Sequence, residues 1–336
     1  MAEPLTVLMS RQAADAFEAR ISTVLDGMPF RIVDLGASPD SAAGYAIDLA
    51  FLTRDVTADS GKAMLAPTLA RFYEIVRASP QLAWLQTHSA GTDRPIYAEL
   101  HGRNVLVTHS SGTTAVPVAQ MAIAGVLALA RRLPALMDAQ RCKSWEPLHP
   151  PRAPRDLGEQ TAVVIGAGPI GREIARLCVA LGMHVLGVSR RPRDVDPPFE
   201  KVFPYGRVDA VLPQADFVIL ACPLTELTRG ILNQASLRLL PVGAHVINVA
   251  RGEVVVEQAL IDALAEGRLG GAFLDVFERE PLDRESPLWG LPNVVISPHT
   301  AAHTAGHFEA VGRLFLENLG RWRRGEALLN VARFRE

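Results

Sequence analysis

Short apolar runs alternate with longer, helically spaced ones along the first hundred residues. Runs rich in β-branched and other apolar side chains at 5–9, 30–35, 47–52, 83–87 and 105–108 predict strands, and apolar positions three and four apart at 13–25 and 62–78 predict helices. Alternation of this kind predicts a parallel sheet with helices on both faces. Ligands bind in the loops at the carboxyl ends of such strands.

The alternation resumes at Thr161 with stronger signals. Strands are predicted at 162–165, 184–189, 217–221, 245–249, 272–276 and 294–296, and helices at 170–181, 234–240, 257–266 and about 305–324. A long apolar helix is predicted at 116–133, between the two halves. We therefore expect an α/β fold of two doubly wound parallel-sheet domains with a cleft between them. These are a flavodoxin-like substrate domain (1–112 and 301–336) and a Rossmann cofactor domain (113–300).

A glycine motif follows the strand predicted at 162–165. Gly166, Gly168 and Gly171 form Gly-x-Gly-x-x-Gly, with Pro169 and Ile170 opening the next helix. Strand, tight glycine turn and helix are the start of a dinucleotide-binding unit, in which the backbone approaches a pyrophosphate at the helix N-terminus. The motif therefore predicts a dinucleotide site.

The strand predicted at 184–189 indicates which dinucleotide binds. In NAD-binding units this strand ends in an acidic residue that holds the ribose 2′-hydroxyl, but here it ends in Ser189, Arg190 and Arg191. An arginine can pair with a 2′-phosphate, and a serine can donate a hydrogen bond to it. We expect NADP(H) to be preferred, with NAD(H) possible.

Composition and charge narrow the classes of partner. The chain is 49% hydrophobic and 21% charged, and its net charge of -2 gives no electrostatic case for nucleic acid or an anionic membrane. Three widely spaced cysteines argue against a disulfide framework or a zinc site, and the N-terminus lacks the basic start of a signal peptide. His303 and His307 are four residues apart, but no third ligand is evident. We expect a cytoplasmic protein without a metal.

Several motifs occur together and in order, at residues 164–171, 222–225 with Thr228, 248–252, 274–282 and 297–299. In these motifs the chain resembles the D-isomer-specific 2-hydroxyacid dehydrogenases along nearly its whole length. Within that family it is most similar to the glyoxylate/hydroxypyruvate reductases, on residues 144–148, 189–191 and 280–289.

The resemblance implies an active site formed by three side chains. Arg251 matches the arginine that binds the carboxylate and carbonyl oxygen of a 2-oxoacid, His299 the proton donor in reduction, and Glu280 the carboxylate paired with that histidine. These residue types suit the chemistry, because a guanidinium binds a carboxylate and a carboxylate orients an imidazole. The implied reaction is NADPH-dependent reduction of glyoxylate or hydroxypyruvate to the 2-hydroxy acid.

Other positions are assigned by the same resemblance. The loop of Ser89, Ala90 and Gly91, which from spacing alone is a plain turn, would receive the substrate carboxylate on its backbone N–H groups. Trp145 matches an aromatic residue that reaches a neighbouring subunit's active site, and a packing tryptophan is the alternative. The implied cofactor contacts also include Asp275, at the nicotinamide amide, and Cys222, Pro223, Thr228, Val249 and Ala250.

Two alternatives to this function stay open. One is a reductase of bulkier 2-oxoacids such as phenylpyruvate, and the other is a dinucleotide-sensing, corepressor-like binding protein. The resemblance also implies a homodimer formed through the long apolar helix at 116–133.

Overall fold

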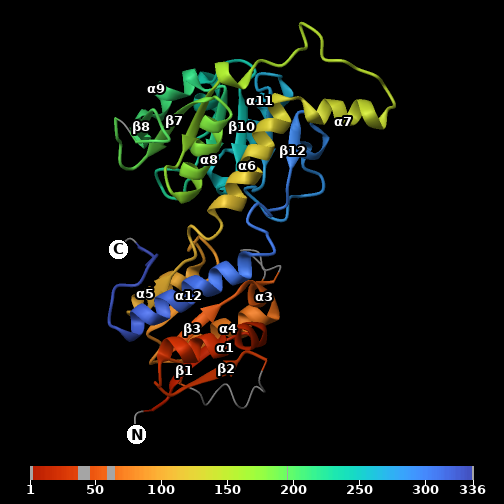
Figure 1. The fold of residues 1–336 in the computed structure, drawn as a ribbon. Coiled ribbons are helices and arrows are strands. Elements are labelled where there is room, and N and C mark those ends of the chain that lie inside the picture. Colours follow the sequence, from red (N-terminus) through yellow and green to blue (C-terminus); the bar gives the residue numbers. More distant parts are fainter. Residues whose placement is uncertain (1–2, 37–45, 59–64, 195, 335–336) are drawn as a thin grey trace. The chain divides into compact units, whose positions relative to one another are not determined.

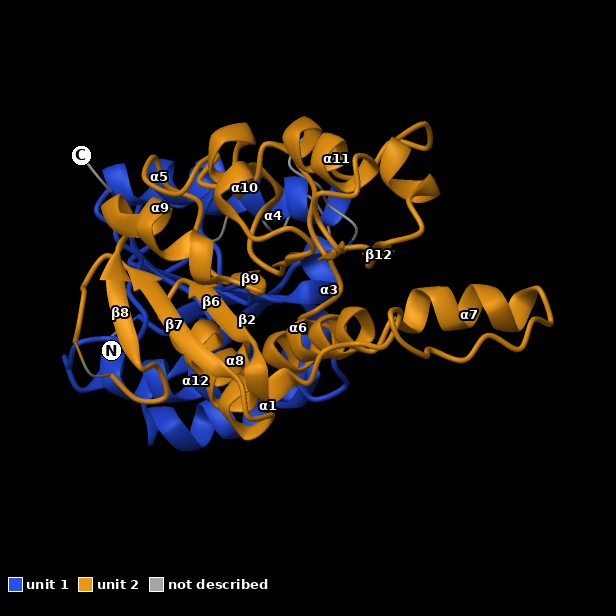
Figure 2. Ribbon diagram, turned by 90° about the horizontal axis from the view of Figure 1, so that it is seen from above, with its two compact units in different colours: residues 1–114, 304–336 blue, residues 115–303 orange. Residues whose placement is uncertain are grey.

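The computed structural model describes residues 3–36, 46–58, 65–194 and 196–334. The chain forms two compact units, residues 1–114 with 304–336 (unit 1) and residues 115–303 (unit 2), coloured separately in Figure 2. The unit boundaries lie at 114/115 and 303/304, beside the 112/113 and 300/301 expected from the sequence.

Unit 1 contains a five-stranded parallel sheet in the order β2-β1-β3-β4-β5. This order is the flavodoxin-like, doubly wound one. All five predicted strands are confirmed, some of them one or two residues shorter than expected. They are β1 (Leu5–Met9), β2 (Phe30–Asp34), β3 (Leu49–Leu52), β4 (Trp84–Thr87) and β5 (Leu106–Thr108).

Helices cover both faces of this sheet (Figure 1). On one face, α1 (Arg11–Leu25) and the C-terminal α12 (His307–Arg323) enclose a core in which the rings of Phe51 and Phe315 stack 4.3 Å apart. On the other face lie α4 (Pro67–Ala78) and α5 (Pro95–Gly102), and α3 (Arg54–Thr57) follows β3. The helix predicted at 62–78 is confirmed from Pro67; residues 62–64 lie outside the described residues.

Unit 2 contains a seven-stranded parallel sheet in the order β12-β11-β10-β9-β6-β7-β8. The six predicted strands are confirmed, and β8 is an additional edge strand. Their bounds are β6 (Thr161–Ile165), β7 (His184–Ser189), β8 (Lys201–Pro204), β9 (Phe217–Leu220), β10 (His245–Asn248), β11 (Gly271–Leu274) and β12 (Val294–Ile296). This is the Rossmann order, with β6 as the first strand; the strand order reverses between the parallel neighbours β6 and β9.

The helices of unit 2 also lie on both faces of its sheet. One face is covered by α6 (Ala115–Ala130) and α8 (Pro169–Ala180), and the other by α9 (Val208–Val211), α10 (Gln234–Leu239) and α11 (Glu257–Ala265). Because α6 packs on β10, β11 and α8, burial within unit 2 accounts for its apolar sequence.

The helix expected at 116–133 is interrupted after Ala130. Arg132 has a left-handed backbone (φ 54°), and α7 (Leu133–Arg141) follows at an angle of 67° to α6. In the parts of the chain that the structure describes, no single helix is long and apolar enough to span a membrane, and only this bent pair passes on length and composition. α7 extends away from the rest of unit 2 (Figure 2) and buries only Ala139.

Candidate active site

The turn between β6 and α8 leaves room for a phosphate group. Gly166 has φ +114°, and a Cβ there would lie 2.6 Å from the carbonyl carbon of Ala221; a Cβ at Gly171 would lie 1.7 Å from the carbonyl oxygen of Gly166. Gly168 is the N-cap of α8, nothing lies within 4 Å of the place a Cβ would take there, and no side chain caps the helix. Open space in front of uncapped helical N–H groups fits the pyrophosphate of a dinucleotide.

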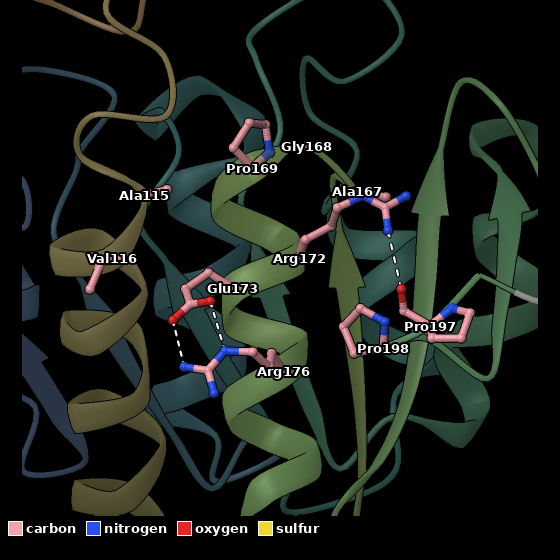
Figure 3. A pocket seen from close by; sticks show the side chains of 10 residues that line it. All are labelled: Ala115, Val116, Ala167, Gly168, Pro169, Arg172, Glu173, Arg176, Pro197 and Pro198. Carbon is pink, nitrogen blue, oxygen red and sulfur yellow. Dashed lines mark hydrogen bonds and ion pairs between the residues drawn. The ribbon is translucent and has the colours of Figure 1, made fainter.

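A pocket of about 590 Å³ borders this turn (Figure 3). Its charged side chains are engaged with neighbours: Arg172 donates to the carbonyl of Pro197 (3.3 Å), and Glu173 pairs with Arg176 (2.7 Å). The pocket is lined by Ala115, Val116, Ala167, Gly168, Pro169, Arg172, Glu173, Arg176, Pro197 and Pro198.

The arginines after β7 differ in their surroundings. The hydroxyl of Ser189 accepts from the N–H of Arg191 (3.2 Å) and donates to its carbonyl (3.0 Å), which folds this segment into a tight turn. Arg190 and Arg191 are exposed, whereas Arg193 pairs with Asp196 (3.1 Å). The two exposed guanidinium groups are thus at the end of the second strand of the Rossmann unit, where a 2′-phosphate would be read.

The loop after β9 is held by a buried threonine. The hydroxyl of Thr228 donates to the carbonyl of Pro223 (2.6 Å) and accepts from the N–H of Thr225 (2.8 Å), and Thr228 is fully buried. Burial raises the pKa of the neighbouring Cys222 thiol to about 12, so this cysteine stays protonated. Thr228 therefore shapes the loop, and its assignment as a cofactor contact stays a prediction.

Arg251 follows β10 in a turn that Asn248 stabilises. The Asn248 side chain accepts from the N–H of Ala250 (3.0 Å) and donates to the carbonyl of Arg251 (3.1 Å), while Nη1 of Arg251 donates to the carbonyl of Ala250 (2.7 Å). Asn248 is buried, as are Val249 and Ala250. The strand end thus holds the backbone of Arg251 in one conformation.

Gly252 brings this turn against the loop after β11. A Cβ at Gly252 would lie 1.8 Å from the carbonyl carbon of Phe277 and 2.2 Å from the amide nitrogen of Glu278. Only glycine lets the two backbones approach so closely. The contact places the Arg251 turn beside the segment that leads to Glu280.

His299 and Glu280 form a direct pair. Nδ1 of His299 lies 2.8 Å from Oε2 of Glu280, and Oε1 of Glu280 accepts from the N–H of Phe277 (3.2 Å). Burial raises the pKa of Glu280, but the His299 hydrogen bond and charge, the Phe277 N–H and the charge of Arg251 together lower it by more. The pKa of Glu280 is therefore below its usual value, and Glu280 interacts electrostatically with both His299 and Arg251.

Asp275 holds the loop that carries His299. Its carboxylate accepts from the hydroxyl of Ser297 and from the N–H groups of Thr300 (2.8 Å) and Ala301 (3.1 Å), and the N–H of His299 donates to its carbonyl (2.8 Å). His299 has a left-handed backbone (φ 51°), which is a strained conformation for a residue other than glycine. The hydrogen bonds of Asp275 stabilise the loop in this conformation. Asp275 thus has a structural role, and its contact with a nicotinamide amide stays a prediction.

The remaining predicted positions are outside this cluster. Ser89, Ala90 and Gly91 form a partly exposed loop after β4 in unit 1. Trp145 lies in the segment after α7 and is 95% exposed, which rules out packing within this chain as its role. His303 precedes α12, so it does not share a helix with His307, and among the residues described no three His, Cys, Asp or Glu side chains form a metal-binding group.

Three supporting residues were not predicted from the sequence. Asn248 and Ser297 position Arg251 and His299 through hydrogen bonds; an asparagine at a strand end before a turn could have indicated the first. Tyr205, after β8, lies within electrostatic range of Arg190 and Cys222: burial and Cys222 raise its pKa, and Arg190 lowers it. No local pattern marks Tyr205.

Comparison with known proteins gives a consistent assignment. The family profile described as "D-isomer specific 2-hydroxyacid dehydrogenase, NAD binding domain" matches residues 123–301, more than half of the chain. A glyoxylate reductase of Thermococcus kodakarensis is 34% identical over 260 residues, 75% of this chain and 77% of that protein.

Solved structures have a fold similar to that of this protein along nearly the whole chain. A D-isomer specific 2-hydroxyacid dehydrogenase of Xanthobacter autotrophicus, in complex with NADPH and MES, has a TM-score of 0.73 at 30% identity and covers 99% of this chain and 98% of its own. An NADPH-dependent glyoxylate/hydroxypyruvate reductase of Sinorhizobium meliloti, in complex with NADP and sulfate, has a TM-score of 0.76 at 26% identity and covers 98% of each chain. The protein belongs to the D-isomer specific 2-hydroxyacid dehydrogenase family of oxidoreductases, whose cofactor is a nicotinamide dinucleotide.

Proposed function

We propose that this protein reduces glyoxylate or hydroxypyruvate to the corresponding 2-hydroxy acid with NADPH. The observation that carries the proposal is the His299–Glu280 pair, 2.8 Å apart, with Arg251 close enough to lower the pKa of Glu280. An imidazole paired with a carboxylate next to a guanidinium is a proton donor beside a carboxylate-binding group. A 2-oxoacid requires both.

Side chains of this protein donate the proton that the reaction requires. Reduction adds a hydride to the carbonyl carbon and a proton to the carbonyl oxygen, and the bound nicotinamide supplies the hydride. Glu280 accepts a hydrogen bond from Nδ1 of His299, which leaves Nε2–H as the proton donor. The Nε2–H bond breaks as the new O–H bond forms, and the hydrogen bond to Glu280 holds the imidazole in the orientation for this transfer.

In this proposal Arg251 is a ligand of the substrate carboxylate, and the Ser89–Gly91 loop of unit 1 keeps its assignment as a carboxylate-binding loop. A guanidinium can bind a carboxylate through two parallel hydrogen bonds, and it polarises the adjacent carbonyl group. The Asn248 turn and the Gly252 approach support this role because they restrict where the guanidinium can reach.

The cofactor assignment is to NADP(H) over NAD(H). The glycine turn of Gly166, Gly168, Pro169, Ile170 and Gly171 would hold the pyrophosphate, and the exposed Arg190 and Arg191 would pair with the 2′-phosphate. The NADP complex of the Sinorhizobium relative supports this preference. The loops at Cys222, Pro223, Val249 and Ala250 would line the rest of the cofactor, with Asp275 at the nicotinamide.

We also propose a homodimer. α7 and the segment after it carry exposed apolar side chains, Leu133, Met137 and Trp145, which are 44%, 51% and 95% exposed, and on α6 Val116 is 50% exposed. A projecting helix with such side chains is typical of a subunit contact. The proposed contact is therefore the helix predicted at 116–133, here α6, together with α7 and its following segment.

Initial-rate kinetics on a panel of 2-oxoacids with NADPH and NADH test this function. We expect saturation with glyoxylate or hydroxypyruvate and a higher kcat/KM with NADPH. Saturation only with phenylpyruvate would favour a reductase of bulkier substrates, and no turnover with any 2-oxoacid would contradict the proposal.

A further inference from the structure

A chain of hydroxyl groups connects the interior of unit 1 to the Ser89–Gly91 loop. The hydroxyl of Tyr97, on α5, lies 3.0 Å from Oγ1 of Thr87, the last residue of β4. Oγ1 of Thr87 lies 3.2 Å from Oγ of Ser89, and the Ser89 hydroxyl donates to the carbonyl of Gly91 (2.8 Å). Tyr97 and Thr87 are buried, with 1% and 0% of their surface exposed.

The direction of this chain follows from its last member. A carbonyl oxygen only accepts, so the single hydroxyl proton of Ser89 is used on Gly91, and Ser89 must accept from Thr87. Thr87 has then used its own proton, so it must accept from Tyr97. The order of donation is Tyr97 to Thr87 to Ser89 to Gly91. Burial raises the pKa of Tyr97 to about 12, so the first donor keeps its proton at working pH.

A second set of buried hydrogen bonds holds the backbone at the start of the loop, at Thr87 and Ser89. The N–H of Ser110 donates to the carbonyl of Ser89 (2.8 Å), and the Ser110 hydroxyl donates to the carbonyl of Thr87 (2.7 Å). The side chain of Gln86 donates to Ser110 (3.1 Å) and accepts from Asn318 of α12 (3.1 Å). Ser110, Gln86 and Asn318 are fully buried, so this anchor is rigid.

Fixing two carbonyl groups fixes the N–H groups that follow them. In a planar trans peptide the C=O and the next N–H point in opposite directions. Ser110 draws the Ser89 carbonyl inward, and Ser89 draws the Gly91 carbonyl toward its own hydroxyl, so the N–H groups of Ala90 and Thr92 are turned the opposite way. The N–H of Ser89 itself contacts Thr87 Oγ1 (3.4 Å).

We propose that Tyr97 is a positioning residue for substrate binding, which acts through Thr87 and Ser89 to aim the backbone N–H groups of the loop at the substrate carboxylate. The inference rests on the proposed function, because it takes the loop as part of the substrate site. Tyr97 touches no substrate; its hydroxyl sets the start of a chain whose end shapes the loop.

The test compares Tyr97→Phe with Tyr73→Phe. Both tyrosines are buried in the same core between β4, α4 and α5, and both variants lose one hydroxyl, but Tyr73 has no part in the hydroxyl chain. For Tyr97→Phe we expect a rise of about tenfold in KM for glyoxylate or hydroxypyruvate, with little change in kcat or in the Kd of NADPH. Tyr73→Phe should leave KM unchanged.

Two further variants follow the same chain. Thr87→Ser keeps the hydroxyl and should retain the wild-type KM, whereas Thr87→Val should match Tyr97→Phe. The double variant Tyr97→Phe/Thr87→Val should be no worse than either single one, because both interrupt one chain. If the role of Tyr97 were purely structural, the two tyrosine variants would lose equal amounts of Tm, and Tyr97→Phe would show no rise in KM that is separate from this loss of stability.

Amide hydrogen exchange of the peptide around residues 88–93 gives a readout that does not depend on activity. We expect faster exchange in Tyr97→Phe than in the wild type or in Tyr73→Phe. If Tyr97→Phe matches Tyr73→Phe in both KM and exchange, the inference is wrong. If the wild type reduces no 2-oxoacid, the proposed function fails, and unchanged exchange in Tyr97→Phe would still overturn the positioning role separately.

Discussion

The imidazole of His299 lies 2.8 Å from the carboxylate of Glu280, although the two residues are 19 positions apart in the chain. They follow the neighbouring strands β11 and β12, whose parallel pairing places both carboxyl ends at one edge of the sheet. Arg251 follows β10, the next strand in the sheet. Three consecutive strand ends thus supply the three side chains to which we assign the proposed reaction.

Glu280→Gln tests the electrostatic part of this pair. The amide keeps the shape of the side chain but lacks the negative charge that accepts the hydrogen bond from Nδ1 of His299, so we expect kcat for reduction to fall about 10- to 100-fold. Because glutamine does not titrate, the loss of activity that accompanies protonation of Glu280 on the acid side should be absent from the variant. In the wild type, the lowered pKa of Glu280 means that activity persists on the acid side until that carboxylate is protonated. An unchanged pH profile in the variant would contradict the pairing.

Replacement of Arg190 and Arg191 by alanine tests the cofactor assignment. Each guanidinium removed from a phosphate should raise the KM for NADPH about 10- to 100-fold and leave the KM for NADH nearly unchanged. Arg193→Ala is the matched control, because that arginine is paired with Asp196. If the NADPH/NADH ratio does not change in the double variant, the NADP assignment is wrong.

Gly252→Ala tests the approach of the Arg251 turn to the Phe277 backbone. Because a Cβ would lie 1.8 Å from the carbonyl carbon of Phe277, one backbone must move, at a cost of about 3 kcal/mol in the free energy of unfolding. We expect a lower Tm and a loss of activity. Gly290→Ala is the control, since nothing lies within 4 Å of the Cβ position there, and its Tm and activity should be near wild type.

His245 gives unit 2 an acid-sensitive stability. His245 is the first residue of β10, and its ring stacks on the ring of Phe217, the first residue of β9. Burial lowers the pKa of His245 to about 4, although Asp216 acts in the opposite direction. Folding therefore favours the neutral form of His245. The contribution of His245 to the free energy of unfolding is fully present above pH 6.5 and is lost as the pH falls from 6.5 to about 4. The loss would amount to roughly 3 kcal/mol.

Urea unfolding of His245→Gln between pH 7 and pH 4.5 measures this contribution. The variant should lose less stability over that range than the wild type, whereas His149→Gln, at an exposed position, should follow the wild type. Equal pH dependence in wild type and His245→Gln would contradict the assignment.

Much of the fold could be predicted because its signals are local. Strands such as β6 and β10 are short apolar runs that end at polar or glycine residues, and their positions agree with the sequence prediction. The elements that were missed are short: β8 is an edge strand of four residues ending in Pro204, and α5 has only eight residues. The break at Arg132 depends on one left-handed residue inside an apolar stretch.

The candidate site was predictable as residue types and less so as geometry. Arg251, Glu280 and His299 could be named from motifs at strand ends, but the hydrogen bonds that hold them could not. Asn248 beneath Arg251 and Ser297 beside Asp275 act through contacts that only the folded loops create. The chain from Tyr97 to Gly91 joins residues of β4, α5 and a loop, so no local pattern indicates it.

The central claim is that His299 donates the proton in the reduction of a 2-oxoacid, and His299→Asn tests it most directly. The measurement compares turnover of hydroxypyruvate and glyoxylate with NADPH, together with the Kd of NADPH, in wild type and variant. We predict that kcat falls by about 100-fold or more while the Kd of NADPH is unchanged. Turnover in His299→Asn equal to that of the wild type would contradict the account.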